Sequence, residues 1–569
     1  MVWRLWRRAL ALGGLSLGLA GLVGLPVQAA EAIFFRYGLV ERSVSTRSLE
    51  TLIETGQLTD DLAFYVNLVG LSEPEVEQLR QNLDRPLEVD GVLLSRFLYS
   101  NLGEDLLGQV GVILQTRVGD NGKLALRAAL IQAATSTEGL SAINVVRSLP
   151  VDMQINLKDA LAVASTVDLI INATVDAVAQ LARLTEQQAA QEPAIDYAEL
   201  ADLTASGPAR VQIQRLNLTD TQRDRQLYVD VVRPRQWRGQ APVMVFSHGL
   251  SSSPEAWHPW ASHLASHGTV VVLPQHPGSD AQQVAEFQSG LSANVFELQE
   301  FIDRPLDITF VIDELERLNP IEFEGRLNLA QVGVGGHSLG GYTALAVTGA
   351  EINIDHLQKA CNSPRDSAQN RNLIHLNVSL LLQCQALELP QQTYSFRDPR
   401  INSVLLVNPV NSSVFGPEGL AAVAVPVMVI AGSYDPATPA VFEQFRTFPW
   451  YTTESRSLAL IEGQAHIDLS ALDAGLSNLL TSLPGLTLAE PEVIDRYLNA
   501  LSLAFVGRYV SRRPEYSLYL RSTYAGYLSQ GELFNLFMVN AGIEVDQELL
   551  EPLEDSLEPL ELPTGQPIE

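Results

Sequence analysis

Ser338, in the segment GGHSLGG (335–341), is the residue of this chain best placed for nucleophilic chemistry. The apolar run LAQVGV precedes the segment and the helix-like run GYTALAVTG follows it, which predicts a strand, a tight turn and a helix. Such a turn strains the serine backbone, and Gly336 and Gly340 avoid the side-chain clashes that the turn would otherwise cause. The same G-x-S-x-G pattern also surrounds Ser16, within an apolar N-terminal run that we expect to be removed. We therefore expect Ser338 to be the nucleophile.

A serine hydroxyl needs a base, because it is a poor nucleophile at neutral pH. His466 follows the last apolar run, SLALIEG, whereas the other two histidines downstream of Ser338 fall in an insertion between strands. Asp435 follows the run VMVIAG, and the alternative acid position, one strand earlier, carries the uncharged Asn408. The order serine, acid, histidine predicts that Asp435 orients His466, which in turn takes the proton of Ser338.

Further residues are expected to bind the oxyanion and the substrate. One oxyanion donor is the backbone N–H of Leu339, directly after the nucleophile. The other is the N–H of Leu250 in the turn FSHGLSSS, where Gly249 permits close approach. His276 and Asp280, in PQHPGSD, are either substrate contacts or a pair that stabilises the turn. We expect no metal and no cofactor, since the histidines of WHPWASHLASHG lack the HExxH spacing.

The segments that carry these residues have the pattern of an α/β protein. After residue 209, two alternating segments (ARVQIQRLNLTD and RQLYVDVVRP) predict antiparallel strands. Six short apolar runs follow, separated by helical segments, from APVMVFSHGL to SLALIEGQAH. Continuous apolar strands indicate a mostly parallel sheet, here of eight strands, with helices on both faces. In such sheets the chemistry lies at the carboxyl ends of the strands, where every candidate above falls.

The start of the chain predicts export. Residues 1–30 combine an arginine-rich segment, an apolar run and the small residues of VQAA, which is typical of a cleaved signal peptide. An uncleaved membrane anchor is the alternative. In a periplasmic or extracellular compartment, Cys361 and Cys384 are expected to form one disulfide, with two buried thiols as the alternative. Both lie in an apolar insertion, residues 350–400, which is either a lid over the site or a helical pair that extends the core.

The remaining segments carry no identifiable chemistry. Residues 31–190 show apolar positions at helical spacing and end in a polar linker, so we expect an all-helical domain of unknown function, with an envelope partner as one role. The α/β region runs from 209 to 540, and residues 541–569 form an acidic, proline-containing tail. The net charge of −29 argues against nucleic acid as a partner, because phosphate binding needs clustered Lys and Arg.

Several motifs resemble those of known enzymes. The pieces FSHGLSSSPEAW, LPQHPGSD, GGHSLGGYT, AGSYDPATP and GQAHIDLS resemble α/β-hydrolases of the platelet-activating-factor acetylhydrolase and dienelactone hydrolase type. The whole chain, including RYGLVERSVSTRSLETL, resembles exported cyanobacterial hydrolases that carry an N-terminal helical domain. The acetylhydrolases can take their acid from the earlier strand, where this chain has Asn408, so the resemblance implies ester hydrolysis without specifying the acyl group.

These observations predict a serine hydrolase of carboxylic esters, acting on a lipid-like or small acyl ester. Two alternatives remain open: a serine peptidase on the same fold, and a non-catalytic protein that binds a partner. Amide substrates distinguish the first alternative. The presence of Ser338, Asp435 and His466 together disfavours the second, because a binding protein does not need all three.

Overall fold

The computed structural model describes residues 30–37, 40–87, 89–361, 377–466 and 487–542. The predicted signal peptide and acidic tail therefore lie almost entirely outside the described residues. The chain divides into two compact units, Met1–Ala162 and Val163–Glu569, which are treated separately below.

The N-terminal unit combines helices with a small sheet of order β2-β1-β4-β3. Its strands are β1 (Ala32–Tyr37), β2 (Val40–Ser45), β3 (Leu114–Thr116) and β4 (Met153–Asn156). Its helices are α2 (Thr46–Thr55), α3 (Asp60–Val69), α4 (Glu73–Asp84), α5 (Gly91–Tyr99), α6 (Asn101–Ile113), α7 (Lys123–Thr135) and α8 (Ala142–Arg147). The expectation of an all-helical region is thus wrong in one respect. The strands are short, and β1 pairs in parallel with β4 from the other end of the unit, which local periodicity does not reveal.

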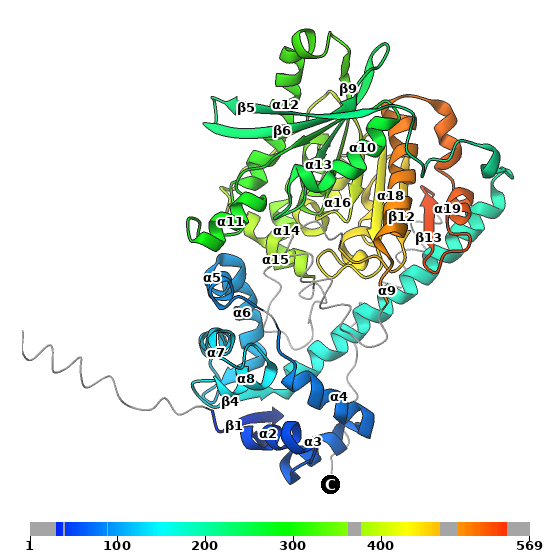
Figure 1. The fold of residues 1–569 in the computed structure, drawn as a ribbon. Coiled ribbons are helices and arrows are strands. Elements are labelled where there is room, and N and C mark those ends of the chain that lie inside the picture. Colours follow the sequence, from blue (N-terminus) through cyan, green and yellow to red (C-terminus); the bar gives the residue numbers. More distant parts are fainter. Residues whose placement is uncertain (1–29, 38–39, 88, 362–376, 467–486, 543–569) are drawn as a thin grey trace, which may run out of the picture. The chain divides into compact units, whose positions relative to one another are not determined.

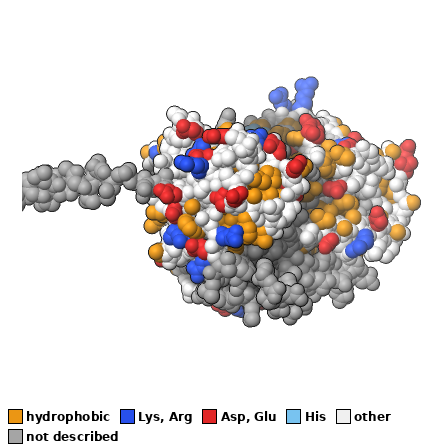
Figure 2. Space-filling model, turned by 90° about the horizontal axis from the view of Figure 1, so that it is seen from below, with side chains coloured by type: hydrophobic (Ala, Val, Ile, Leu, Met, Phe, Trp, Pro, Cys, Tyr) orange, Lys and Arg blue, Asp and Glu red, His pale blue; other side chains and the backbone are white. Residues whose placement is uncertain are grey.

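Several large apolar side chains of this unit are exposed. Leu68, Val92, Tyr99, Val118 and Leu124 each expose 60% or more of their surface. Figure 2 shows apolar side chains gathered in patches among acidic and basic ones on the face seen from below. Exposed apolar surface is typical of the sites at which proteins contact partners. The envelope partner of this region stays a prediction.

The second unit is built on a nine-stranded sheet of order β13-β12-β11-β10-β9-β7-β8-β6-β5. The strands from β7 to β12 run parallel, whereas β5, β6 and β13 are antiparallel to their neighbours. Their bounds are β5 (Val211–Asp220), β6 (Arg225–Pro234), β7 (Ala241–Ser247), β8 (Val270–Pro274), β9 (Leu327–His337), β10 (Ile401–Val407), β11 (Val427–Gly432), β12 (Arg456–Ile461) and β13 (Leu536–Asn540). The predicted mostly parallel sheet is confirmed, with β13 as one edge strand more than expected.

Helices cover both faces of this sheet (Figure 1). They include α10 (His258–Ser266), α11 (Ala281–Ser289), α12 (Glu300–Glu322), α13 (Leu339–Thr348), α14 (Ile354–Cys361), α15 (Val378–Gln385), α16 (Ser412–Ala421), α18 (Pro491–Phe505) and α19 (Ser522–Leu528). Strand β7 shows why its sequence is continuously apolar. Val243 and Val245 pack into the core cluster with α12 and α13, while Met244 and Phe246 pack into the opposite cluster with α10 and α18.

Helix α9 (Leu157–Gln191) crosses the boundary between the units. In its second half Ala177 and Leu181 are completely buried in the core of the second unit, and Gln188 Nε2 donates to the Asn540 carbonyl. The sequence placed the end of the N-terminal region near residue 190, whereas the compact units divide at Ala162 and Val163. The difference arises because one uninterrupted helix contains the boundary.

The predicted disulfide is confirmed. Cys361, at the end of α14, is bonded to Cys384 in α15, and residues 362–376 between the two helices lie outside the described part of the chain. None of the helices in the described ranges has both the length and the apolar character that crossing a membrane requires.

Candidate active site

Ser338 lies in the turn between β9 and α13, as its sequence context predicted. Its φ of 56° and ψ of −120° are strained for a residue with a side chain, at a cost of about 1–3 kcal/mol. Two backbone hydrogen bonds hold this conformation: Ser338 N–H donates to the Val407 carbonyl at 3.0 Å, and Val410 N–H donates to the Ser338 carbonyl at 3.1 Å. The nucleophile candidate is therefore fixed by the end of the neighbouring strand β10.

The two predicted glycines of this turn are required by close approach. A Cβ on Gly336 would lie 2.0 Å from the Gly340 carbonyl oxygen. A Cβ on Gly340 would lie 1.9 Å from the Ser247 carbonyl oxygen, at the end of β7. The absence of both side chains lets α13 begin directly against the sheet.

Asp435 lies in the turn that follows β11, with 4% of its surface exposed. Its Oδ2 accepts from His466 Nδ1 at 2.7 Å, from Asn408 Nδ2 at 2.6 Å and from Thr438 Oγ1 at 2.7 Å. Its Oδ1 accepts from the N–H groups of Ala437 and Thr438. Burial opposes the charged form, but the His466 ring and the Thr438 hydrogen bonds outweigh it and lower the pKa of Asp435 to about 2. The carboxylate is therefore charged at neutral pH.

His466 follows β12 and lies beside the turn that carries Ser338. Since its Nδ1 faces a charged carboxylate, this nitrogen carries the proton and Nε2 is the basic atom. The His466 ring lies 4.6 Å from the ring of His337, the residue before the serine, and His337 packs 5.6 Å from Trp257 on its other side. Because β9, β11 and β12 belong to the parallel part of one sheet, their carboxyl ends bring Ser338, Asp435 and His466 to the same edge.

Asn408 has a role that the sequence did not reveal. It occupies the alternative acid position after β10, with a positive φ of 45°. Its Oδ1 accepts from Gln464 Nε2 at 2.8 Å, which leaves Nδ2 to donate to Asp435. Asn408, at the alternative acid position, thus supports Asp435 by a hydrogen bond. In the sequence, only the place of Asn408 in the segment VNPVNSS, directly after a predicted strand, pointed to a role in the site.

The two predicted oxyanion donors lie on either side of the Ser338 turn. Leu339 is the first residue of α13, and the first N–H groups of a helix have no acceptor within it. Leu250 follows Gly249, whose backbone approaches the nucleophile so closely that a Cβ there would lie 3.2 Å from Ser338 Cβ. No hydrogen bond from the Leu250 N–H is made to another of the described residues. Both N–H groups can therefore serve an oxyanion at Ser338.

The structure places His276 and Asp280 away from such a role. His276 is completely buried, and its ring nitrogens contact Asp307 Oδ2 and Ser247 Oγ, both at 3.0 Å. Asp280 begins α11 by accepting from the Gln283 N–H at 2.9 Å, and it also accepts from a neighbouring glutamine. These contacts favour the turn-stabilising alternative over substrate contact for both residues.

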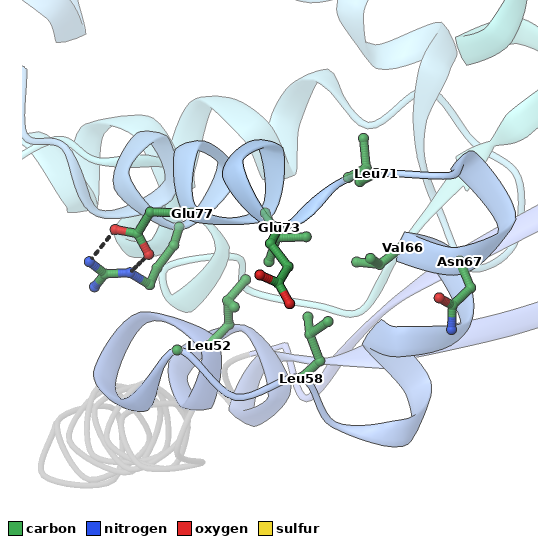
Figure 3. A pocket seen from close by; sticks show the side chains of 10 residues that line it. Leu52, Leu58, Val66, Asn67, Leu71, Glu73 and Glu77 are labelled. Carbon is green, nitrogen blue, oxygen red and sulfur yellow. Dashed lines mark hydrogen bonds and ion pairs between the residues drawn. The ribbon is translucent and has the colours of Figure 1, made fainter.

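A hollow of about 450 Å³ lies elsewhere, between α2, α3 and α4 of the N-terminal unit (Figure 3). Leu52, Leu58, Val66 and Leu71 contribute apolar walls, and the Glu73 carboxylate points between the helices. No serine, cysteine or histidine is among the described residues that line it. In the described ranges, no cluster of histidine, cysteine and acidic residues is arranged to hold a metal ion.

Two families match this chain. Residues 244–466 match the family described as "Alpha/beta hydrolase family", a range that begins in β7 and ends at His466. Residues 29–156 match "Alpha/beta hydrolase of unknown function (DUF1400)". The second unit has the α/β-hydrolase fold, and the matches support a hydrolase.

Neither family description names a substrate. Among curated proteins none matches the chain. Neither family description names an acetylhydrolase or a bacterial group, so that finer resemblance stays a prediction.

Proposed function

We propose that this protein is a serine hydrolase of carboxylic esters. The observation that carries the proposal is the buried Asp435–His466 pair, joined at 2.7 Å, beside a serine held in a strained turn. A buried acid, an oriented imidazole and a serine at a strand-to-helix turn are the parts that acyl transfer needs.

The reaction follows from the roles of these groups. Ser338 Oγ attacks the ester carbonyl while His466 Nε2 takes its proton, and Asp435 stabilises the resulting imidazolium. The carbonyl oxygen becomes an oxyanion that accepts from the N–H groups of Leu250 and Leu339. The C–O bond to the alcohol breaks as His466 returns the proton to it. Water, activated by His466, then cleaves the acyl-serine and releases the carboxylic acid.

The insertion that contains α14 and α15 contacts the carboxyl edge of the sheet. Gln383 Oε1 in α15 accepts from the N–H groups of Ser413 and Val414, each at 2.8 Å. Those residues follow β10 at the carboxyl edge of the sheet, where the candidate site lies. We propose that the insertion, closed by its disulfide, borders the acyl-binding side of the site. A disulfide is also compatible with the proposed export.

Hydrolysis of p-nitrophenyl esters from acetate to palmitate tests this function. We expect turnover by the wild-type protein and a loss of at least about 10³-fold in kcat for Ser338→Ala. The best chain length reports how much acyl chain the site accommodates. Cleavage of p-nitroanilides at a comparable rate would favour a peptidase, and no turnover of any ester would contradict the proposal.

A further inference from the structure

A cluster of buried polar side chains lies behind the oxyanion turn and is not used in the reaction above. It contains Ser247, His248, His276, Arg304 and Asp307, each with at most 1% of its surface exposed. Burying so many polar groups is costly unless each has a defined partner. The hydrogen bonds of the cluster therefore show what it holds in place.

The proton positions of His276 follow from its partners. Its Nδ1 lies 3.0 Å from Asp307 Oδ2, which also accepts from Arg225, so the carboxylate is an acceptor and Nδ1 carries the proton. His276 Nε2 therefore accepts from the Ser247 hydroxyl at 3.0 Å. Burial and the nearby Arg304 charge lower the pKa of His276 far below its usual range, so the ring is neutral.

The same reasoning assigns the proton of His248. The backbone N–H of His276 donates to His248 Nε2 at 3.2 Å, so this nitrogen has no proton. Burial, followed by the Arg304 charge, keeps the pKa of His248 far below its usual range, so its ring is neutral too. Its proton is then on Nδ1, which donates to the Gly249 carbonyl at 2.7 Å. Arg304 Nη2 also lies 3.4 Å from Nδ1, but its much shorter hydrogen bond is to the His248 carbonyl, at 2.5 Å.

This hydrogen bond fixes the peptide that contains the proposed oxyanion donor. In a trans peptide, the carbonyl of Gly249 and the N–H of Leu250 lie in one plane and point in opposite directions. Holding the Gly249 oxygen therefore sets the direction of the Leu250 N–H. Arg304 Nη2 holds the preceding peptide by donating to the His248 carbonyl at 2.5 Å. Gly249 leaves no room for a side chain beside the Ser338 turn, since a Cβ there would lie 2.9 Å from His337 Nδ1.

We propose that His248 is a positioning residue for catalysis, which aims the Leu250 N–H at the oxyanion through its Nδ1–H bond to the Gly249 carbonyl. This inference rests on the proposed function. His276, held by Asp307 and Ser247, keeps His248 in the required tautomer, and Arg304 fixes the turn from the other side.

Two substitutions of His248 separate this role from simple packing. In His248→Asn the side-chain amide nitrogen takes the place of Nδ1 and still donates to the Gly249 carbonyl. In His248→Gln the amide group takes the place of Nε2, and the bond to Gly249 is lost. We expect kcat/KM to fall by roughly 10- to 100-fold in the Gln variant, with KM little changed, and by less than about 5-fold in the Asn variant.

A trifluoromethyl ketone supplies the readout specific to the oxyanion. The serine oxygen adds to its carbonyl carbon, the proton goes to His466, and the carbonyl oxygen becomes a stable oxyanion. Its inhibition constant should rise in the Gln variant by the same factor by which kcat/KM falls. Circular dichroism and thermal unfolding show whether each variant is folded.

The outcomes are distinguishable. Equal activity of two folded variants, whether high or low, would overturn the role of His248. No ester turnover and no ketone binding by the wild-type protein would overturn the proposed function and this inference with it. Nitrogen-15 NMR of protein labelled at histidine reads the tautomer of His248 in the wild-type protein itself. We expect the His248 signals, assigned by their loss in His248→Asn, to show an Nδ1-protonated neutral ring, and an Nε2-protonated ring would contradict the inference.

Discussion

Asp435 contributes to the proposed site by orientation and charge and does not touch the substrate. Asp435→Asn leaves a residue of the same shape but removes the charge and presents an amide to His466 Nδ1. We expect kcat to fall by on the order of 10³–10⁴-fold, since the imidazolium loses its stabilising charge. Ester turnover measures this directly. The matched control is Asp224→Asn, at an exposed turn between β5 and β6, which should retain wild-type turnover. If kcat fell by less than about 10-fold in Asp435→Asn, Asp435 would not be the acid of the catalytic site.

The low pKa of Asp435 also makes a prediction about stability. A carboxyl whose folded pKa of about 2 is below its ordinary value of 3.8 stabilises the folded state above pH 3.8, by about 2 kcal/mol. This contribution is lost as the pH falls through about 2. Wild type should therefore lose about 1 kcal/mol relative to Asp435→Asn between about pH 5 and about pH 3. Urea unfolding of both proteins at the two pH values measures the difference between their free energies of unfolding. A difference that does not change with pH would show that the folded state does not lower the pKa of Asp435.

At this scale the sequence predicted which residues could react but not which residues support them. Ser338, His466 and Asp435 each follow an apolar run, so their positions can be inferred from local pattern. The roles of Asn408 and His248 depend on contacts between strand ends far apart in the chain. The sequence left His276 open between substrate contact and turn stabilisation for the same reason: its turn was predicted, but its burial against α12 was not.

The turn between β9 and α13 depends on a missing side chain. In Gly340→Ala the added Cβ would meet the Ser247 carbonyl at 1.9 Å, a backbone atom that cannot move without moving β7. We expect a loss of about 1–3 kcal/mol in stability and a loss of ester turnover, because the turn that carries Ser338 must shift. Gly526→Ala, in α19, is the control, since nothing lies within 4 Å of its added Cβ. It should be neutral or stabilising in thermal unfolding. Equal stability of the two variants would contradict the close packing of the turn between β9 and α13.

The disulfide between α14 and α15 should stabilise the second unit. Its cysteines are separated by 23 residues, and closing such a loop contributes about 3 kcal/mol in the chain-entropy model. Reduction should therefore lower the apparent Tm of the wild-type protein, measured by scanning fluorimetry with and without reductant. The Cys361→Ser/Cys384→Ser double variant should have the Tm of the reduced wild-type protein, both with and without reductant. If reductant also lowered the Tm of that variant, the effect would not come from this bond.

Among the elements, the parallel strands were predictable and the added strands were not. Strands β7 to β12 are apolar on both faces, which gives a strong local signal. Strand β13 lies at the edge of the sheet, after a region of helical pattern, and pairs only with β12. In the N-terminal unit, β3 and β4 have three and four residues, too few for a period to be recognised.

The two units predict where the chain can be divided. Leu181 and Leu184 of α9 are buried in the core of the second unit, and Glu192 accepts hydrogen bonds from Ser522 and Thr523. A fragment of residues 163–569 keeps these contacts, whereas a fragment of residues 209–569, the boundary inferred from sequence, loses them. Losing two buried leucines alone would cost about 4–10 kcal/mol. We expect cooperative unfolding of the longer fragment and aggregation or a much lower Tm for the shorter one. Equal Tm values would contradict the assignment of α9 to the second unit.

Covalent labelling of Ser338 tests the proposed nucleophile most directly. A fluorophosphonate forms a bond from the serine oxygen to phosphorus with loss of fluoride, and it needs an activated serine but no particular acyl group. Mass spectrometry of the intact protein and of its peptides should find one adduct per chain, on Ser338, absent from Ser338→Ala and formed far more slowly by Asp435→Asn. The absence of any adduct, or an adduct that forms equally fast on Ser338→Ala, would contradict a catalytic role for this site.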